Sequence, residues 1–246
     1  VGTRLGMQQT GFNWQQFGRN AYVVHVDIDR AELDKGHPKI DLPVCADAGD
    51  FLARLLPNVR GNWGSWLSYA KEVRKALPLD DPTNETGEGF ISPFKFYADL
   101  VRLSTPEDVI IPCSSGGANS VSMQVIEQKL GQVIITDKGL ASMVYGLGGA
   151  IGASMAHPGR RTFLIEGDGG FSQNLQELAT VAVNNLPIKT FIFANNGYGS
   201  IRMTQKNYFG GAYLGCDTET GLGFPDWDLL FQSFGLATMT LDNNWS

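Results

Sequence analysis

Hydrophobic and polar positions alternate in blocks along the chain, and the blocks predict a repeated order of strands and helices. Short apolar runs between turn residues are typical of strands buried on both faces, whereas apolar residues three or four positions apart indicate helices. The expected strands are residues 109–112, 133–135, 162–165 and 189–193. The expected helices are residues 93–103, 143–156 and 175–183. This alternation predicts an α/β fold with a doubly wound parallel sheet.

The N-terminal part carries a shorter version of the same pattern. Residues 22–29 and 44–48 are typical of two strands, and residues 50–56 can form a helix. So few elements bury little surface, which suggests half of a Rossmann-like central domain. A helix and an acidic segment rich in glycine and proline follow. We therefore divide the chain into part of a central domain, a helix with a linker, and a second domain, at residues 1–60, 61–89 and 90–246. Residues 237–241 also have the pattern of a strand.

One segment needs to be considered as a membrane span. Residues 139–156 contain no charged side chain, but they include five glycines and three polar residues. Their modest hydrophobicity favours a buried, closely packed helix over a membrane span. Gly148 and Gly152 lie one turn apart, and we expect another backbone to approach the helix there.

Composition and charge exclude some classes of function. The formal net charge is -6, whereas nucleic-acid binding normally requires a basic surface. We therefore expect neither a nucleic-acid nor a membrane partner. The three cysteines are far apart and form no CxxC pair, which favours reduced thiols in a cytoplasmic protein.

Two polar loops carry the candidate chemistry. The aspartate loop (residues 166–170, EGDGG) follows the third expected strand of the second domain, and the asparagine loop (residues 194–199, ANNGYG) follows the fourth. About 25 residues separate GDG from the first asparagine, enough for one helix and one strand. Such a unit returns the chain to the same edge of a parallel sheet, where ligands bind. Asp168 and Asn195 should therefore face one site.

These residue types suit Mg²⁺, which takes about six hard oxygen ligands and usually obtains only some of them from protein. The Asp168 carboxylate, the Asn195 amide oxygen and a backbone carbonyl, taken here as that of Gly197, would supply three. Diphosphate oxygens and water would complete the shell. Gly167, Gly169 and the following Gly170 would let backbone N–H groups approach the phosphates.

The GDG motif, the interval and NN together resemble the diphosphate signature of thiamine-diphosphate (ThDP) enzymes. Residues 139–153, 166–189 and 195–202 resemble the acetolactate-synthase large-subunit branch and its sugar-modifying carboligase relatives. Residues 22–33 and 43–48 resemble the end of that family's central domain. The resemblance implies ThDP and Mg²⁺ as cofactors.

The resemblance also implies roles for individual residues. Asp168 and Asn195 correspond to the side-chain ligands of Mg²⁺, and Asn196 is the rival if the asparagine loop is shifted by one. Met143 corresponds to the apolar residue beneath the cofactor, which brings the cofactor's amine against the cofactor's reactive carbon. This is the one catalytic role that the resemblance implies for a residue of this chain. Plain core packing is the alternative for Met143. The backbone around Ala141 would bind the aminopyrimidine. The remaining expected cofactor contacts are Ser115, Gly116, Gly117, Gly167, Gly169, Gly170, Gly197 and Tyr198. For residues 114–119, a merely flexible loop is the alternative.

The implied reaction is decarboxylation of a 2-oxo acid such as pyruvate, followed by carboligation. A simple decarboxylase and a carboligase that modifies a keto-sugar remain alternatives, because acetolactate synthases usually carry tryptophan where this chain has Thr204. Asp27 and Asp29 resemble a segment near FAD in acetolactate synthases, but relatives without FAD share it, so FAD stays open.

Family members place the site between subunits, and an N-terminal domain supplies a glutamate to it. We therefore expect this chain to be a fragment without turnover of its own, and the full-length protein to be a homodimer or homotetramer. A non-catalytic binding module is the alternative class. A Rossmann dehydrogenase is disfavoured because the glycines of residues 146–152 do not have the required spacing.

Overall fold

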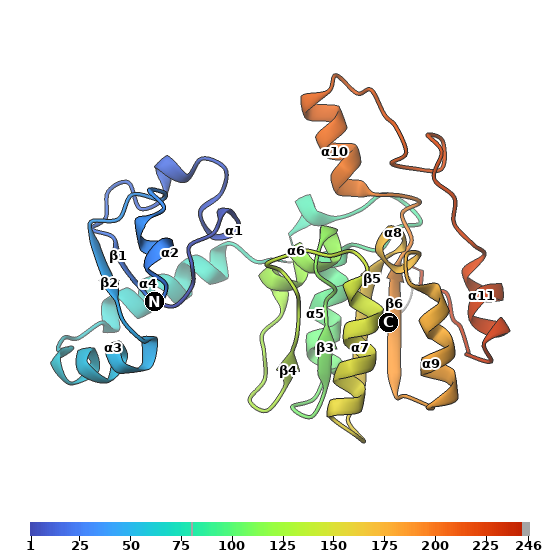
Figure 1. Cartoon of the computed structure of the whole chain (residues 1–246), viewed down its shortest axis with the longest axis horizontal. Helices are drawn as coiled ribbons and strands as arrows, with labels where there is room; N and C mark the ends of the chain where they lie inside the picture. The colour runs from blue at the N-terminus through green and yellow to red at the C-terminus, as the bar shows by residue number, and fades with distance from the viewer. Residues whose placement is uncertain (80, 243–246) are drawn as a thin grey trace. The chain divides into compact units, whose positions relative to one another are not determined.

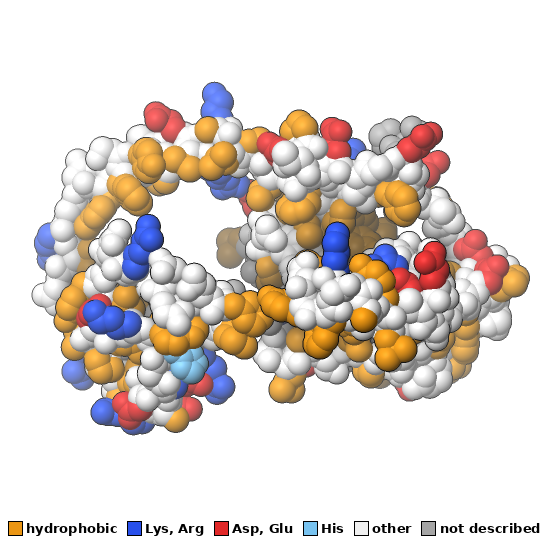
Figure 2. Space-filling model, turned by 90° about the horizontal axis from the view of Figure 1, so that it is seen from above, with side chains coloured by type: hydrophobic (Ala, Val, Ile, Leu, Met, Phe, Trp, Pro, Cys, Tyr) orange, Lys and Arg blue, Asp and Glu red, His pale blue; other side chains and the backbone are white. Residues whose placement is uncertain are grey.

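The computed structural model describes residues 1–79 and 81–242 (Figure 1). The chain divides into two compact units, Val1–Val73 and the part from Arg74 onward. Hydrophobic side chains reach the surface of both units (Figure 2). Among the described residues, no helix combines the length and the apolar character needed to cross a membrane.

The first unit is built on two parallel strands, β1 (Val24–Asp27) and β2 (Leu42–Cys45), with Val24 opposite Leu42 and Asp27 opposite Cys45. Asp47 caps the helix after β2 by accepting hydrogen bonds from the backbone N–H groups of Gly49 and Asp50, at 2.7 and 3.1 Å. The expected two strands and helix are confirmed, with shifts of a few residues. The helices of this unit are α1 (Met7–Thr10), α2 (Arg30–Asp34) and α3 (Ala48–Leu55), with 3₁₀ helices η1 (Trp14–Gln16) and η2 (Leu56–Asn58).

Helix α4 (Gly64–Ala76) follows, as the sequence predicts, and the short 3₁₀ helix η3 (Pro82–Asn84) lies in the segment predicted as a linker. None of the residues of α4 is buried. Trp66 and Leu67 are 66% and 55% exposed, so this helix contributes little to a core.

The second unit contains a parallel sheet in the order β4-β3-β5-β6. Its register places Val109 opposite both Val133 and Thr162, and Thr162 opposite Ile188. The strands are β3 (Val109–Ile111), β4 (Val133–Ile134), β5 (Thr162–Gly167) and β6 (Ile188–Phe193). All four are strands that the sequence predicts, and the parallel sheet of the expected α/β fold is confirmed.

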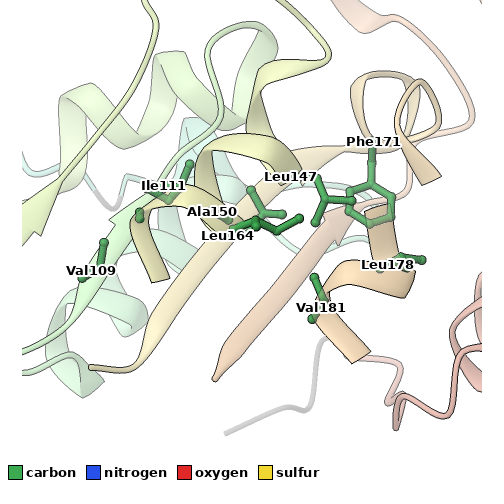
Figure 3. Close-up of a cluster of buried hydrophobic side chains, with 10 residues drawn as sticks. Val109, Ile111, Leu147, Ala150, Leu164, Phe171, Leu178 and Val181 are labelled. Carbon is green, nitrogen blue, oxygen red and sulfur yellow. The ribbon is translucent and has the colours of Figure 1, made fainter. Parts of the chain in front are cut away.

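Helices cover both faces of this sheet (Figure 1). Val109, Ile111 and Leu164 point to one face and belong to a buried cluster that also contains Leu147 and Leu178 (Figure 3). Alternate strand residues point to the opposite face and pack on a second cluster; they are Ile110, Phe163 and Ile165. The first face is covered by α7 (Tyr145–Ala156), α9 (Leu178–Val183) and α11 (Trp227–Ser233), and the second by α5 (Pro93–Leu103) and α6 (Gly116–Val125).

Three sequence predictions are corrected. Gly148 and Gly152 are exposed, and the close approach in α7 occurs at Gly146, where an added Cβ would clash with the carboxylate of Glu166 in β5. The helix expected at residues 175–183 begins as a 3₁₀ turn, η4 (Leu175–Glu177), before α9. Residues 237–241 form no strand, because they have no ladder partner among the described residues.

Candidate functional site

Four loops meet at the carboxyl ends of the four parallel strands in the second unit. β5 runs into the short helix α8 (Asp168–Phe171), and β6 leads through the asparagine loop into α10 (Gly199–Tyr208). β3 leads to α6, and β4 leads to the segment before α7. Figure 1 shows α8 and the start of α10 above the ends of β5 and β6. The topology therefore gathers the predicted site segments at one edge.

Asp168 joins the two polar loops. It is the first residue of α8 and is only 1% exposed. Its Oδ1 accepts a hydrogen bond from the N–H of Gly169 at 2.7 Å, and its Oδ2 accepts one from the N–H of Asn196 at 2.6 Å. Burial raises the pKa of the Asp168 carboxyl above its ordinary value, although these N–H groups oppose the rise. A buried carboxylate therefore lies where both loops meet.

Asn195 places its side chain beside this carboxylate. One atom of its side-chain amide lies 3.2 Å from Oδ1 of Asp168 and 2.7 Å from the carbonyl oxygen of Gly197. If the amide oxygen takes this position, three oxygens without a hydrogen between them repel one another unless a cation lies among them. If the amide is rotated by half a turn, its N–H₂ group instead donates to both oxygens. With the amide oxygen turned inward, the site offers a carboxylate, an amide oxygen and a carbonyl oxygen, the donor set preferred by a hard divalent cation.

The rival residue, Asn196, has a different position. It contacts Asp168 through its backbone N–H, and its φ of 59° is left-handed. The side chain that reaches Asp168 and Gly197 is that of Asn195. Within residues 1–79 and 81–242, no group of three or more His, Cys, Asp or Glu side chains could hold a metal. A metal at Asp168 would therefore take its remaining ligands from amide and carbonyl oxygens, a bound ligand or water.

Tyr198 closes the gap between the two polar loops. Its ring lies so close to Gly169 that an added Cβ would clash with it, which explains why residue 169 must lack a side chain. Its hydroxyl accepts a hydrogen bond from Nε2 of Gln173 at 3.2 Å. Gly170 is similarly enclosed, by the carboxylate of Glu166 and the carbonyl oxygen of Met143. Gly167 is the N-cap of α8.

The loop after β3 presents the free end of a helix. Ser115 is the N-cap of α6, and no side chain caps the helix. An added Cβ at Gly116 or Gly117 would meet no atom within 4 Å, so there is open space in front of these residues. The N–H groups at a helix N-terminus attract anions. Residues 115–117 could therefore bind a phosphate group.

The loop before α7 lies against the loop after β3. The Ser114 hydroxyl donates to the carbonyl oxygen of Ser142. Ala141 has a left-handed φ of 54°, which turns the chain towards Met143. The sulfur of half-buried Met143 lies 3.9 Å from Nε2 of Gln173, which comes from the segment after α8. Ala141 and Met143 are thus held beside the loops that contain Ser115 and Asp168.

Glu166 is a feature of the site that sequence reasoning missed. It is 3% exposed, and burial raises its pKa to about 7, although the nearby Cys113 thiol and the N–H of Gly167, which donates to the carboxylate, oppose the rise. Its carboxylate fills the space left by Gly146 and Gly170. The available signal was a glutamate at the end of an otherwise apolar strand.

Family models cover most of the chain. Residues 115–244, more than half of the sequence, match the model of the thiamine pyrophosphate enzyme C-terminal TPP binding domain. Residues 1–55 match the thiamine pyrophosphate enzyme central domain. The chain therefore belongs to the thiamine pyrophosphate enzyme family, as the GDG and NN motifs predict.

Similar curated proteins are acetolactate synthase large subunits. The chain is 31% identical to that of Porphyra purpurea over 99% of its own length and 41% of the relative. It is 30% identical to a probable large subunit of Methanocaldococcus jannaschii over 96% of the chain and 40% of the relative. The chain therefore spans about two fifths of the length of these relatives.

A solved structure has the same fold. The thiamine diphosphate-dependent 4-hydroxybenzoylformate decarboxylase of Rhodococcus jostii RHA1 matches with a TM-score of 0.64 and 25% identity. The match covers 88% of this chain and 38% of that chain.

Proposed function

We propose that this chain carries the diphosphate- and metal-binding part of a ThDP- and Mg²⁺-dependent enzyme that decarboxylates a 2-oxo acid and joins the product to an acceptor. The observation that carries the proposal is the convergence of the Asp168 carboxylate, the Asn195 side-chain amide and the Gly197 carbonyl at the meeting point of the two polar loops.

Each part of the site has a role in binding. Asp168, the amide oxygen of Asn195 and the carbonyl oxygen of Gly197 would hold Mg²⁺. A divalent cation also favours the ionised form of Asp168, which burial alone disfavours. The buried carboxylate is therefore better suited to a metal complex than to the free chain.

The diphosphate would be bound mainly by backbone groups. The uncapped start of α6 at Ser115, Gly116 and Gly117 offers N–H groups in front of open space. The absence of side chains at Gly167 and Gly169 leaves the backbone of the aspartate loop accessible, and Tyr198 packs on Gly169. These residues would orient the cofactor without taking part in bond changes.

Met143 and Ala141 would contact the organic part of the cofactor. Met143 lies outside the two main hydrophobic clusters and beside Gln173, which favours a cofactor contact over core packing. When bound, ThDP supplies the carbon nucleophile and electron sink that decarboxylation of a 2-oxo acid requires. The protein binds, orients and shields it.

Single observations bear on the acceptor and on a further cofactor. The similar Rhodococcus jostii protein is a decarboxylase, which makes a simple decarboxylase the second candidate, and a keto-sugar acceptor stays a third. Asp27 accepts hydrogen bonds from the N–H groups of Arg4 and Asp29, and Asp29 caps α2. Because these carboxylates serve local structure, FAD is not included in the proposal. A cytoplasmic location, and a homodimer or homotetramer of the whole protein, remain predictions.

Calorimetric titration of the chain with ThDP, with and without Mg²⁺, tests the proposal. We expect binding that requires Mg²⁺ and is lost in Asp168→Ala, because that variant removes the only carboxylate of the proposed ligand set. Equal binding by both proteins, or no binding at any Mg²⁺ concentration, would contradict the proposal. For the non-catalytic alternative, the distinguishing result is cofactor binding without pyruvate turnover by the full-length protein.

A further inference from the structure

A turn that is distant in sequence fixes the asparagine loop from behind. Residues 216–220, here called the 216–220 turn, lie against this loop. The N–H of Tyr198 donates to the carbonyl oxygen of Cys216 at 2.8 Å, and Gly197 pairs with Asp217 in an isolated antiparallel bridge. A Cβ added at Gly197 would clash with the backbone of Cys216. The turn therefore leaves the Gly197 carbonyl little freedom to move.

Asp217 holds this turn together. It is 6% exposed, and its Oδ1 accepts hydrogen bonds from the hydroxyl and the N–H of Thr220 at 2.7 and 2.9 Å. Its backbone carbonyl accepts another from the N–H of Leu222 at 2.9 Å. The hydrogen bond from the Thr220 hydroxyl lowers the pKa of Asp217, and Arg202 lowers it further, although burial opposes them. The Asp217 carboxylate is therefore ionised near neutral pH.

Arg202 connects the turn to the helix that leaves the asparagine loop. Its guanidinium donates to Oδ2 of Asp217 at 2.6 Å. Its backbone N–H donates to the carbonyl oxygen of Tyr198 at 2.9 Å, in the first turn of α10. Gly197, Tyr198, Arg202 and Asp217 therefore form a closed ring of contacts. The ring links the side chain of a buried aspartate to the backbone of the asparagine loop.

We propose that Asp217 is a positioning residue for the metal site, acting through its ion pair with Arg202 to hold the Gly197 carbonyl towards the Asn195 amide. This inference rests on the proposed function, because Asp217 can position a metal ligand only if the metal site exists. The side chains of Asp217 and Arg202 contact no proposed ligand of the cation. Groups that orient metal ligands from behind typically change metal affinity by about 10–100-fold when they are altered.

Two substitutions remove the ion pair while preserving most other contacts. Asp217→Asn keeps an acceptor for Thr220 but loses the charge that faces Arg202. Arg202→Met keeps an unbranched side chain in α10 and removes the guanidinium. Arg202 and Asp217 line a cavity of about 450 Å³ beside Asn195 and Asn196, and Glu219 lines it too. Because Glu219 is an exposed carboxylate, Glu219→Gln is the matched control.

The measurement is ThDP binding by the 246-residue chain at increasing Mg²⁺, followed by calorimetry. Each of the two variants is expected to need about 10–100-fold more Mg²⁺ for half-maximal binding and to recover wild-type binding at saturating Mg²⁺. Glu219→Gln is expected to match the wild type. Because both substitutions break one contact, the double variant should be no worse than the more affected single variant.

Amide hydrogen exchange gives a readout that does not depend on the cofactor. Both variants should exchange faster at the N–H groups of Asn196 and Tyr198, while the amides of β5 keep their protection. If Asp217→Asn does not fold, the exchange rates and the Mg²⁺ requirement of Arg202→Met alone test whether the ion pair positions the Gly197 carbonyl.

The outcomes separate this inference from the proposed function. If the wild type shows no Mg²⁺-dependent binding, the proposed function fails and the inference fails with it. If the wild type binds but the variants have the same Mg²⁺ requirement, only the inference is overturned. Loss of binding that excess Mg²⁺ does not restore would also overturn it, because it would indicate general damage rather than a misplaced ligand.

Discussion

The carboxylate of Glu166 occupies the space that a side chain at residue 146 would need. Gly146 lies in α7 and Glu166 near the end of β5, so the missing side chain lets the helix approach the strand that carries the aspartate loop. Both residues are buried. The position of α7, and with it that of the preceding segment containing Met143, therefore depends on this glycine.

Gly146→Ala should destabilise the chain. The added methyl group would clash with a carboxylate that is itself enclosed, and overpacking of this kind costs about 1–3 kcal/mol. Gly152→Ala is the matched control in the same helix, because residue 152 is exposed and a Cβ there meets no atom within 4 Å. Alanine at that position should stabilise the helix by about 1 kcal/mol. Urea denaturation measures both changes, and equal effects of the two substitutions would refute the packing argument.

Asn195→Ala and Asn196→Ala should separate the two candidate metal ligands. Asn195→Ala removes the side-chain amide that faces Asp168 and Gly197, so Mg²⁺-dependent ThDP binding should weaken strongly. Asn196→Ala keeps the backbone N–H that donates to Asp168, so its effect should come mainly from the left-handed φ of 59°, which alanine tolerates less well.

Titration with ThDP at several Mg²⁺ concentrations distinguishes the two cases. A shifted Mg²⁺ requirement in the Asn195 variant alone supports the assignment. The reverse order of effects would make Asn196 the ligand.

Much of the second unit could be predicted because its sequence signals are local. The apolar runs that form β3 and β5 are bounded by turn residues, and the interval between GDG and NN leaves room for one helix and one strand before β6. Because neighbouring parallel strands end at the same edge, that interval was enough to bring Asp168 to the asparagine loop.

The contacts that could not be predicted depend on non-local packing. Spacing alone identified Gly148 and Gly152 as a pair, but spacing does not tell which side of a helix faces the sheet. The glycine of this helix that faces the sheet is Gly146. The pairing of Gly197 with Asp217 joins residues separated by a helix and a loop, and no local pattern indicates it. Residues 237–241 alternate like a strand, yet a strand also needs a partner with free backbone groups.

A buried ion pair at the opposite edge of the sheet should make the stability of the chain depend on pH. Oδ1 and Oδ2 of Asp108, which is 2% exposed, accept hydrogen bonds from Nε and Nη2 of Arg161 at 2.9 and 2.8 Å. Burial alone would raise the pKa of Asp108, but Arg161 and the N–H of Thr105 outweigh it and hold this pKa below its ordinary value. The ionised form is therefore favoured in the folded chain, which stabilises the fold above the unfolded pKa of about 4.

Asp108→Asn should therefore lower the free energy of unfolding by roughly 1–3 kcal/mol at pH 7. The difference from the wild type should stay constant down to about pH 5 and shrink as the pH falls below about 4, where the wild-type carboxylate also becomes protonated. Asp99→Asn, whose partners Lys95 and Arg102 are 51% and 68% exposed, is the control and should cost less than about 0.5 kcal/mol. Urea denaturation between pH 7 and pH 3 measures these values. A difference for Asp108→Asn that does not change with pH would show that lost packing, rather than the ion pair, causes the destabilisation.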